Sequence, residues 1–346
     1  MLNVQIVLFD GFDLLDAIAP FEVFSATSLH AKNAVSVQFV TAEGPRSVTS
    51  GINGLNIEAS GTLDPEQSGI ILVPGASGEI EGDGPDSIPA ILGRAVHTSV
   101  IDLVARALGQ QGVIVATVCG GSLLLAMGGL LEDRPAVTHH LGMELLGATG
   151  AVPVPARVVD HGNLVTGGGV TSGLDVSLYL VERELGPRIA HAVERLFEYE
   201  RRGTVWRETG MALGRQDALT GTEPSSASDE APEVHERPSP DRLIARASDF
   251  DGDWDTVIAT PVGKMQVRLS ISTRHGTIRG KATQGNETVE FINPVLEDNM
   301  LTWMLRITKP MRLHLKFEVA ADGDQMVGSA KAGMLPASKL TGMRIS

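Results

Sequence analysis

A strand, a glycine turn and a helix surround the single cysteine, and this pattern constrains the fold more than any other feature. The apolar run Val113–Cys119 is short and rich in β-branched residues, as a buried parallel strand should be. Gly120, Gly121 and Ser122 form a small-residue turn, and Leu123–Met127 then has the composition of a helix. A strand that enters a helix in this way is typical of a mainly parallel sheet, and it presents the turn residue at the carboxyl edge.

Two interpretations of Cys119 are open from this stretch. The turn can present the thiol in the manner of a nucleophile elbow, where nearby N–H groups at the helix start favour the thiolate. An isolated cysteine can equally be a buried core residue that behaves as a small hydrophobe. A nucleophile also needs a proton donor or acceptor and N–H groups aimed at developing negative charge. The rest of the chain has to supply both.

The first two hundred residues alternate between strand and helix patterns, which predicts a mainly parallel sheet with helices on both faces. Ligands of such sheets bind outside the carboxyl ends of the strands, where Cys119 is expected. The predicted strands cover residues 4–9, 35–40, 69–74, 113–119 and 136–138, with hairpins at 48–59 and 156–166. The predicted helices cover residues 16–25, 87–110, 141–146, 171–185 and 187–202.

The length of 346 residues and a change of composition predict two domains. We expect an α/β domain over residues 1–205 and an acidic, Pro- and Ser-rich flexible linker over 206–243. Beyond it, residues 244–346 contain about eight short runs with a period of two and turn residues between them. This pattern predicts a small antiparallel β-barrel or sandwich.

The charge and the cysteine count exclude several classes of protein. A net charge of −14 leaves no basic surface for nucleic acid and disfavours anionic membranes, so we expect small-molecule or protein partners. One cysteine cannot form an intrachain disulfide, which fits a reducing cytoplasm. The start Met1–Phe9 has the pattern of a strand and not of a signal peptide. No His-Glu-x-x-His spacing occurs, and we predict neither a metal nor a cofactor.

Asp16 is the first candidate partner of Cys119. It follows the first predicted strand at the same sheet edge, among apolar residues that would raise its pKa and keep it protonated. A protonated carboxyl group there can donate a proton. The alternative is that Asp16 is the N-cap of the helix that follows.

Backbone N–H groups and a histidine complete the candidate site. The N–H groups of Gly75 and Ala76, with that of Gly120, can form an oxyanion site at the ends of their strands. His139 follows another strand, and its open roles are site lining, general base or a purely structural one. Asp175 lies at a predicted helix start, where capping or packing is more common than chemistry.

A set of separated motifs in the first domain resembles one known family. The motifs are Leu15-Asp16-x-x-x-Pro20-x-Glu22-Val23, Val73-Pro74-Gly75, Val118-Cys119-x-Gly121-Ser122, Leu130, Thr138-His139 and Gly167-Gly168-Gly169-Val170-Thr171-x-Gly173-x-Asp175. Their order is similar to that in the isonitrile hydratase branch of the DJ-1/PfpI superfamily, over about residues 3–203. The resemblance implies a flavodoxin-like domain of the class I glutamine amidotransferase-like type, usually a homodimer. It also implies a Cys119 nucleophile paired with the acid Asp16.

Departures from that branch bear on the substrate. Gly120 stands where isonitrile hydratases of the branch carry threonine, and PfpI-type proteases carry a histidine that Gly120 cannot replace as a base, so peptidase activity is not expected. Ala76 replaces the second glycine of a Pro-Gly-Gly sequence but keeps its N–H.

The C-terminal part resembles lipocalin-like β domains appended to some hydrolases, through Trp254, Thr260–Gly263 and Leu340–Arg344. A β-rich second half disfavours a helix-turn-helix regulator.

The resemblance implies a lyase that hydrates an isonitrile to an N-substituted formamide. Two alternatives stay open. One is glyoxalase-like action of the same Cys119–Asp16 pair on an α-oxoaldehyde, through a hemithioacetal. The other is a non-catalytic sensor or ligand-binding protein in which Cys119 oxidises.

Overall fold

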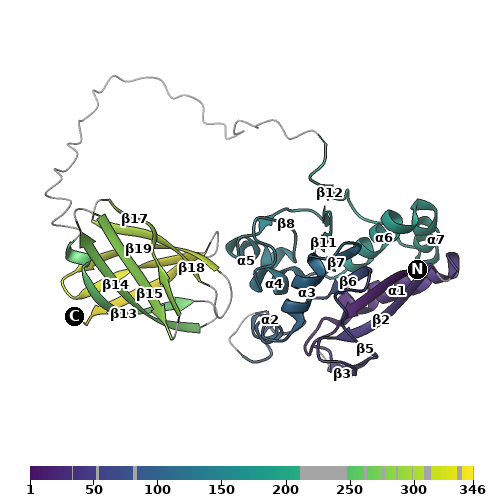
Figure 1. Ribbon diagram of the computed structural model, residues 1–346, viewed down its shortest axis with the longest axis horizontal. Coiled ribbons are helices and arrows are strands. Elements are labelled where there is room, and N and C mark those ends of the chain that lie inside the picture. Colours follow the sequence, from purple (N-terminus) through teal and green to yellow (C-terminus); the bar gives the residue numbers. More distant parts are fainter. Residues whose placement is uncertain are drawn as a thin grey trace, which may run out of the picture.

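The described residues form two large sheets in a computed structural model, one in each domain, and two small two-stranded sheets (Figure 1). The structure describes residues 1–32, 34–51, 54–80, 84–210, 248–260, 263–274, 277–285, 287–297, 299–307, 313–332 and 337–345. Most of the predicted linker 206–243 therefore lies outside the described residues. The two sheets share no strand, in agreement with an α/β domain followed by a β domain.

The α/β domain contains an eight-stranded sheet whose centre is parallel. Its strands are β1 (Leu2–Val7), β2 (Val35–Thr41), β5 (Gly61–Thr62), β6 (Gly69–Val73), β7 (Val113–Thr117), β10 (Val158–His161), β11 (Leu164–Gly167) and β12 (Trp206–Arg207). The order is β12-β10-β11-β7-β6-β1-β2-β5. The five central strands β2-β1-β6-β7-β11 pair in parallel and have the 2-1-3-4-5 order of a flavodoxin-like fold.

The hairpins lie where the sequence predicted them. β3 (Arg46–Thr49) pairs antiparallel with β4 (Asn56–Ala59), and β10 pairs antiparallel with β11. β12 pairs with β10, so the sheet continues just past the expected domain boundary at residue 205. The strand predicted at 136–138 is β8 (Pro135–Ala136), which pairs with β9 (Val152–Pro153) and ends early because Val137 N–H donates to the Thr166 hydroxyl.

Two groups of helices cover the α/β sheet. The helices are α1 (Leu14–His30), α2 (Ile88–Val96), α3 (Val100–Leu108), α4 (Gly121–Met127), α5 (Met143–Ala148), α6 (Ser172–Leu185) and α7 (Pro187–Phe197), with the 3-10 turn η1 (His140–Gly142). α1, α6 and α7 pack against one another, while α2 contacts α3 and α4, and α4 contacts α5 (Figure 1). The central strands β6 and β7 are buried along their whole length.

Two helix predictions were wrong in extent. The segment 87–110 is not one helix: α2 and α3 meet at 69° across the break, where Thr98 donates to the Ala95 carbonyl and accepts from the Val100 N–H. α7 ends at Phe197 and not at 202, because Glu198 adopts a left-handed φ of 49°. Within the described residues no single helix has the length and hydropathy of a membrane span, although the bent pair α2–α3 passes that test together.

The β domain is one antiparallel sheet of nine strands that curls into a nearly closed barrel. In the order β16-β15-β14-β13-β21-β20-β19-β18-β17, only the two edge strands lack a second partner. The strands are β13 (Gly252–Thr260), β14 (Gly263–Arg274), β15 (Thr277–Gln284), β16 (Glu287–Glu290), β17 (Ile292–Glu297), β18 (Met300–Ile307), β19 (Leu313–Asp322), β20 (Gln325–Ala332) and β21 (Ser338–Arg344). A 3-10 turn, η2 (Ser248–Phe250), precedes them, whereas the sequence predicted no helical element there.

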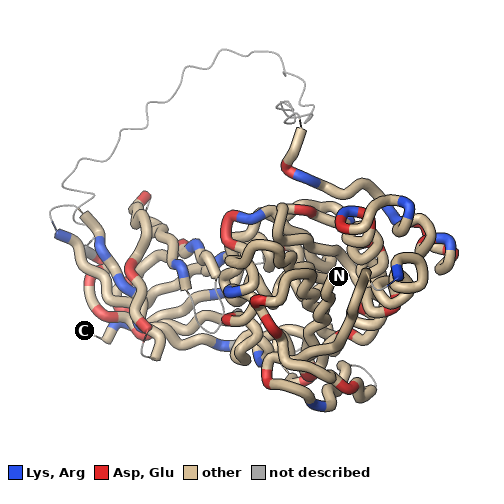
Figure 2. The backbone as a smooth tube through the Cα atoms, turned by 45° about the vertical axis from the view of Figure 1, so that its right-hand side comes forward, with Lys and Arg blue, Asp and Glu red and all other residues tan. Residues whose placement is uncertain are grey.

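The barrel contacts the α/β domain through β18 and β19. Arg306 forms a 3.0 Å ion pair with Glu132, and Leu313 packs against the core of the α/β domain. α5 contacts β19. Charged residues of both signs are interspersed along both domains in Figure 2.

Candidate functional site

The candidate site lies at the carboxyl edge of the parallel sheet, as predicted. Cys119 comes two residues after β7, Gly75 two residues after β6, and Gly168 directly after β11. Asp16 comes from the first turn of α1, which follows β1. Four strands that are distant in the sequence thus deliver the site residues to one edge.

Asp16 is not the N-cap of its helix. Asp13 is the cap, because its carboxylate accepts from the N–H groups of Leu15 and Asp16 at 2.9 and 3.2 Å. Asp16 is fully buried, and its Oδ2 accepts from the Gly75 N–H at 2.9 Å. The capping alternative is therefore wrong.

Burial raises the pKa of the Asp16 carboxyl well above its ordinary value, and the charge of Asp13 raises it further. The 2.9 Å hydrogen bond from the Gly75 N–H and the interaction with the Cys119 side chain lower the pKa by less. The balance favours the protonated acid, which agrees with the prediction for a carboxyl group among apolar residues.

Cys119 is 8% exposed and adopts a left-handed φ of 55°, which is unusual for a residue with a Cβ. Burial raises the pKa of its thiol, and the charge of Asp16 raises it further, whereas the Gly120 N–H lowers it. The N–H group thus acts toward the thiolate, as expected of the turn, but burial and the Asp16 charge outweigh it, and the net direction is upward.

The raised pKa values of Asp16 and Cys119 belong to one coupled pair. Asp16 repels the thiolate only when Asp16 is ionised, and a smaller repulsion comes from Asp13. When Asp16 holds the proton, its own repulsion is absent and its carboxyl group can donate to the sulfur. With a single proton, one group of the pair can donate that proton while the other carries negative charge.

The backbone N–H groups named from the sequence have different partners. The Gly75 N–H is used by Asp16, so Gly75 contributes by holding the acid. A Cβ on Gly75 would lie 2.5 Å from the Gly120 nitrogen and 2.8 Å from Asp16 Oδ2, which explains the glycine. A Cβ added to Gly120 would lie 3.5 Å from the Ala76 nitrogen, so Ala76 and Gly120 border the same space.

His139 lies in the loop between β8 and η1, against Gly169: a Cβ on Gly169 would be 3.1 Å from the His139 Cδ2. Its Nδ1 accepts from the Leu141 N–H at 3.3 Å. Burial lowers the pKa of the imidazole, and the neighbouring His140 lowers it further. A neutral ring of this kind is compatible with site lining and with a general base, so both predicted roles stay open.

Thr138 is a site residue that sequence reasoning did not single out. Its buried hydroxyl donates to the Cys119 carbonyl at 2.7 Å. Beside it, the hydroxyls of Thr117 and Ser122 are 2.6 Å apart under the turn. The only signal in the sequence was that Thr138 precedes His139, because nothing local shows which carbonyl a hydroxyl will reach.

Asp175 has a structural role, in agreement with its expected place in packing. It lies in the first turn of α6 and is buried. Its carboxylate accepts from Arg157 at 2.6 Å, from the Tyr199 hydroxyl at 3.0 Å and from the Arg202 N–H at 2.8 Å. Asp175 therefore ties the segment after α7 to α6.

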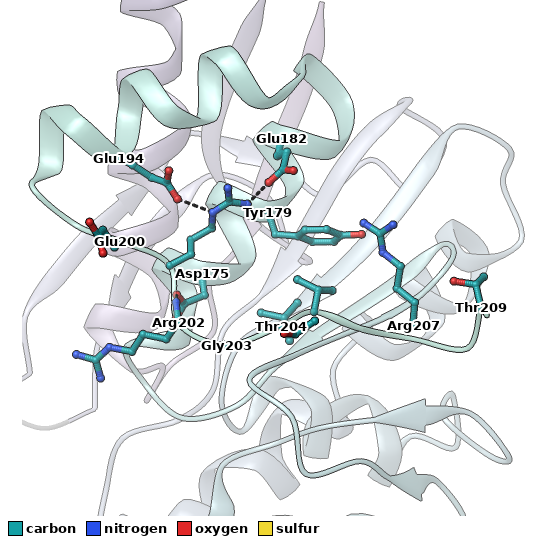
Figure 3. A pocket seen from close by; sticks show the side chains of 13 residues that line it. Asp175, Tyr179, Glu182, Glu194, Glu200, Arg202, Gly203, Thr204, Arg207 and Thr209 are labelled. Carbon is teal, nitrogen blue, oxygen red and sulfur yellow. Dashed lines mark hydrogen bonds and ion pairs between the residues drawn. The ribbon is translucent and has the colours of Figure 1, made fainter. Parts of the chain in front are cut away.

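A cavity of about 710 Å³ lies over this segment and not at Cys119 (Figure 3). Residues of α6, α7 and the segment 199–209 line it, and its charged groups are largely paired internally, as Arg201 is with Glu194 and Glu182. Among the residues that the structure describes, no three His, Cys, Asp or Glu side chains are arranged to hold a metal ion.

Comparison with known proteins connects this site to a family. The chain is 33% identical over 199 residues to the isonitrile hydratase of Pseudomonas putida, a match that covers 57% of this chain and 78% of that protein. It is 24% identical over 193 residues to the HTH-type transcriptional regulator CdhR of Pseudomonas aeruginosa, covering 55% of this chain and 53% of the regulator.

Solved structures of DJ-1-like proteins are also similar to this chain. A ThiJ/PfpI family protein from Pseudomonas syringae is 24% identical, with a TM-score of 0.49, over 58% of this chain and 76% of that one. DJ-1beta of Drosophila melanogaster is 17% identical, with a TM-score of 0.46, over 57% of this chain and 98% of that one. The family model described as "DJ-1/PfpI family" matches residues 3–183, and the chain belongs to that family.

Proposed function

We propose that the α/β domain hydrates an isonitrile to an N-substituted formamide, as a lyase with Cys119 as nucleophile and Asp16 as acid and base. The observation that carries the proposal is the buried Asp16 carboxyl group beside the Cys119 thiol, held there by the Gly75 N–H. The similarity to an isonitrile hydratase supports the substrate class. The reaction needs no redox partner, because water adds across the isonitrile carbon and nitrogen.

The first half of the reaction consumes the single proton of the pair. Protonated Asp16 gives its proton to the isonitrile carbon, which becomes electrophilic. The Cys119 thiolate then forms a C–S bond to that carbon. The products are an Asp16 carboxylate and a thioimidate on the sulfur. The raised pKa of Asp16 supports this step, because it keeps the acid protonated when substrate enters.

The second half returns the proton. The Asp16 carboxylate takes a proton from water as the hydroxide adds to the thioimidate carbon, and that proton passes to the substrate nitrogen. The C–S bond then breaks as the hydroxyl proton returns to Asp16. Formamide leaves, and the thiolate and the protonated acid are restored. The Gly120 and Ala76 N–H groups border the space where negative charge develops during this half.

Formamide production from a panel of alkyl and aryl isonitriles tests the proposal. We expect turnover by the wild type and a loss of at least about 1000-fold in the Cys119→Ala variant, because the covalent step is removed. The far-ultraviolet circular dichroism of the variant should be unchanged, since alanine keeps the Cβ of the turn. An active alanine variant would exclude the mechanism.

The same panel separates the alternatives. Lactate release from methylglyoxal without formamide production would favour the α-oxoaldehyde reaction of the Cys119–Asp16 pair. Sulfinate formation at Cys119 under peroxide, with no turnover of either substrate, would favour a sensor. The similarity to a transcriptional regulator is the reason for testing the sensor hypothesis as well.

The proposal also includes a homodimer formed through the α/β domain and a reducing compartment such as the cytoplasm. The single cysteine is a free thiol, which fits such a compartment. Sedimentation of the full chain tests the first point, because a monomer at micromolar concentration would contradict it.

A further inference from the structure

The backbone of Cys119 is held in its left-handed conformation from two sides. The Cys119 N–H donates to the Gly168 carbonyl at 2.8 Å, which fixes the peptide before the cysteine. The Thr138 hydroxyl donates to the Cys119 carbonyl at 2.7 Å, which fixes the peptide after it. A conformation with φ of 55° persists only where surrounding contacts determine it. These two bonds are such contacts.

The second peptide contains the N–H that faces the thiol. A trans peptide is planar, so the Cys119 carbonyl and the Gly120 N–H point in opposite directions along one rigid unit. The Gly120 N–H is the backbone group that acts on the Cys119 thiol and lowers its pKa. The hydroxyl of Thr138 therefore sets the direction of that N–H by holding the opposite end of the same peptide.

Thr138 is suited to this role by its burial. Its residue is 1% exposed, so water does not compete for the Cys119 carbonyl. A carbonyl that accepts a hydrogen bond also polarises its peptide, and the N–H at the other end becomes a stronger donor. The bond thus has two effects on Gly120, one of geometry and one of polarity.

We propose that Thr138 is a positioning residue, whose hydroxyl aims the Gly120 N–H at the Cys119 sulfur and at the negative charge that develops beside it in the reaction. The effect on the charge that develops in the reaction rests on the proposed function. The effect on the Cys119 sulfur does not, since it concerns the thiol alone.

The Thr138→Val variant keeps the shape of the side chain and removes the donor. Because Cys119 is the only cysteine, alkylation by iodoacetamide reports on this thiol alone. We expect the alkylation rate of Thr138→Val at a fixed pH to fall about tenfold, with the half-maximal rate at higher pH, because a thiolate that loses an N–H bond is less stable. Asp16 and Asp13 are the charged groups that act on this thiol, and the variant leaves both in place.

Two further variants separate positioning from packing. Thr138→Ser keeps the hydroxyl and should restore most of the alkylation rate. Thr27→Val removes a matched buried hydroxyl, which donates to the Val23 carbonyl at 2.8 Å inside α1, and should leave the pH profile of Cys119 unchanged. If Thr138→Val does not fold, the Thr138→Ala and Thr138→Ser pair makes the same comparison, since both lack the methyl group.

The outcomes distinguish this inference from the proposed function. An alkylation profile of Thr138→Val equal to that of the wild type would overturn the positioning role, even if formamide is produced. A shifted profile in a protein without isonitrile turnover would support the positioning role and reject the function. When the positioning role and the isonitrile hydration both hold, kcat of Thr138→Val should fall about tenfold with little change in KM. The reason is that the Gly120 N–H acts on charge that forms during the reaction.

Discussion

The two domains differ in what they bury. The α/β domain buries two carboxylate residues, Asp16 and Asp175, together with the Cys119 thiol. In the described part of the β domain, the only buried polar or charged residue is Thr256, whose hydroxyl donates to the Val267 carbonyl. Buried ionisable groups lower the stability of a protein unless other groups hold them, so their presence makes the α/β domain the candidate for chemistry.

The domains also differ in how neighbours in space relate to the sequence. Asp16 and Gly75, which meet through one hydrogen bond, are 59 residues apart, and Thr138 and Cys119 are 19 apart. In the barrel most paired strands are consecutive hairpins, such as β13 with β14 and β18 with β19. Its core centres on Trp303, which stacks between Phe291 and Phe317 at 4.3 and 4.9 Å. The candidate site therefore depends on long-range placement, whereas the barrel depends on packing between neighbouring strands.

Replacement of Asp16 by asparagine tests the chemical side of this comparison, with the largest expected effect. Formamide production should fall by about 1000-fold, because an amide cannot supply the proton. The pKa of Cys119 should fall, since the Asp16 charge is one of the causes that raise it, so alkylation of the variant should reach half its maximal rate at lower pH. Activity and thiol reactivity should therefore move in opposite directions. A variant that loses both would indicate a collapsed site.

Replacement of Trp303 by alanine tests the packing side. Loss of this buried ring should destabilise the barrel by about 3 kcal/mol. Formamide production should stay within about twofold of the wild type, because the barrel buries no group that the reaction uses. Calorimetry of the full chain would measure the first effect. Trp303→Phe is the matched control, because it keeps an aromatic ring in the stack. It also removes an indole N–H that has no hydrogen-bond partner among the described residues, so it should lower the free energy of unfolding by less than Trp303→Ala does. A large loss of turnover in Trp303→Ala would break the comparison.

The ion pair between Glu132 and Arg306 joins the two domains, and it gives the smallest expected effect. Both side chains are partly exposed, so the pair should contribute only about 0.5 kcal/mol. A double-mutant cycle with Glu132→Ala and Arg306→Ala, followed by denaturation, measures the coupling. A coupling of about 2 kcal/mol or more would show that the domains are not energetically separate.

Much of the first domain could be predicted because its signals are local. The run before Cys119, the glycines after it and the alternation of strands and helices each need only neighbouring residues to be recognised. The hairpins at 46–59 and 158–167 follow from the same local patterns. The predicted helix over 87–110 failed because Thr98 satisfies backbone groups on both sides of a break, which periodicity does not show.

The candidate site could be predicted only in part. Cys119 and Asp16 follow from their places after two strands, and the parallel sheet brings them to one edge. The partner of the Gly75 N–H, the cap at Asp13 and the bond from Thr138 depend on the exact approach of separate loops. The likeness of the second domain to lipocalin-like domains stays a prediction.

Local patterns of residues were enough to predict the fold class and the alternation of strands and helices along the chain, and to name Asp16 and Cys119 as candidates, because periodicity and turn residues act over a few positions. Only the tertiary structure decided the pKa directions of Asp16 and Cys119. The physical reason is that burial and electrostatic coupling depend on groups brought together from distant segments, and no local pattern of residues contains that information.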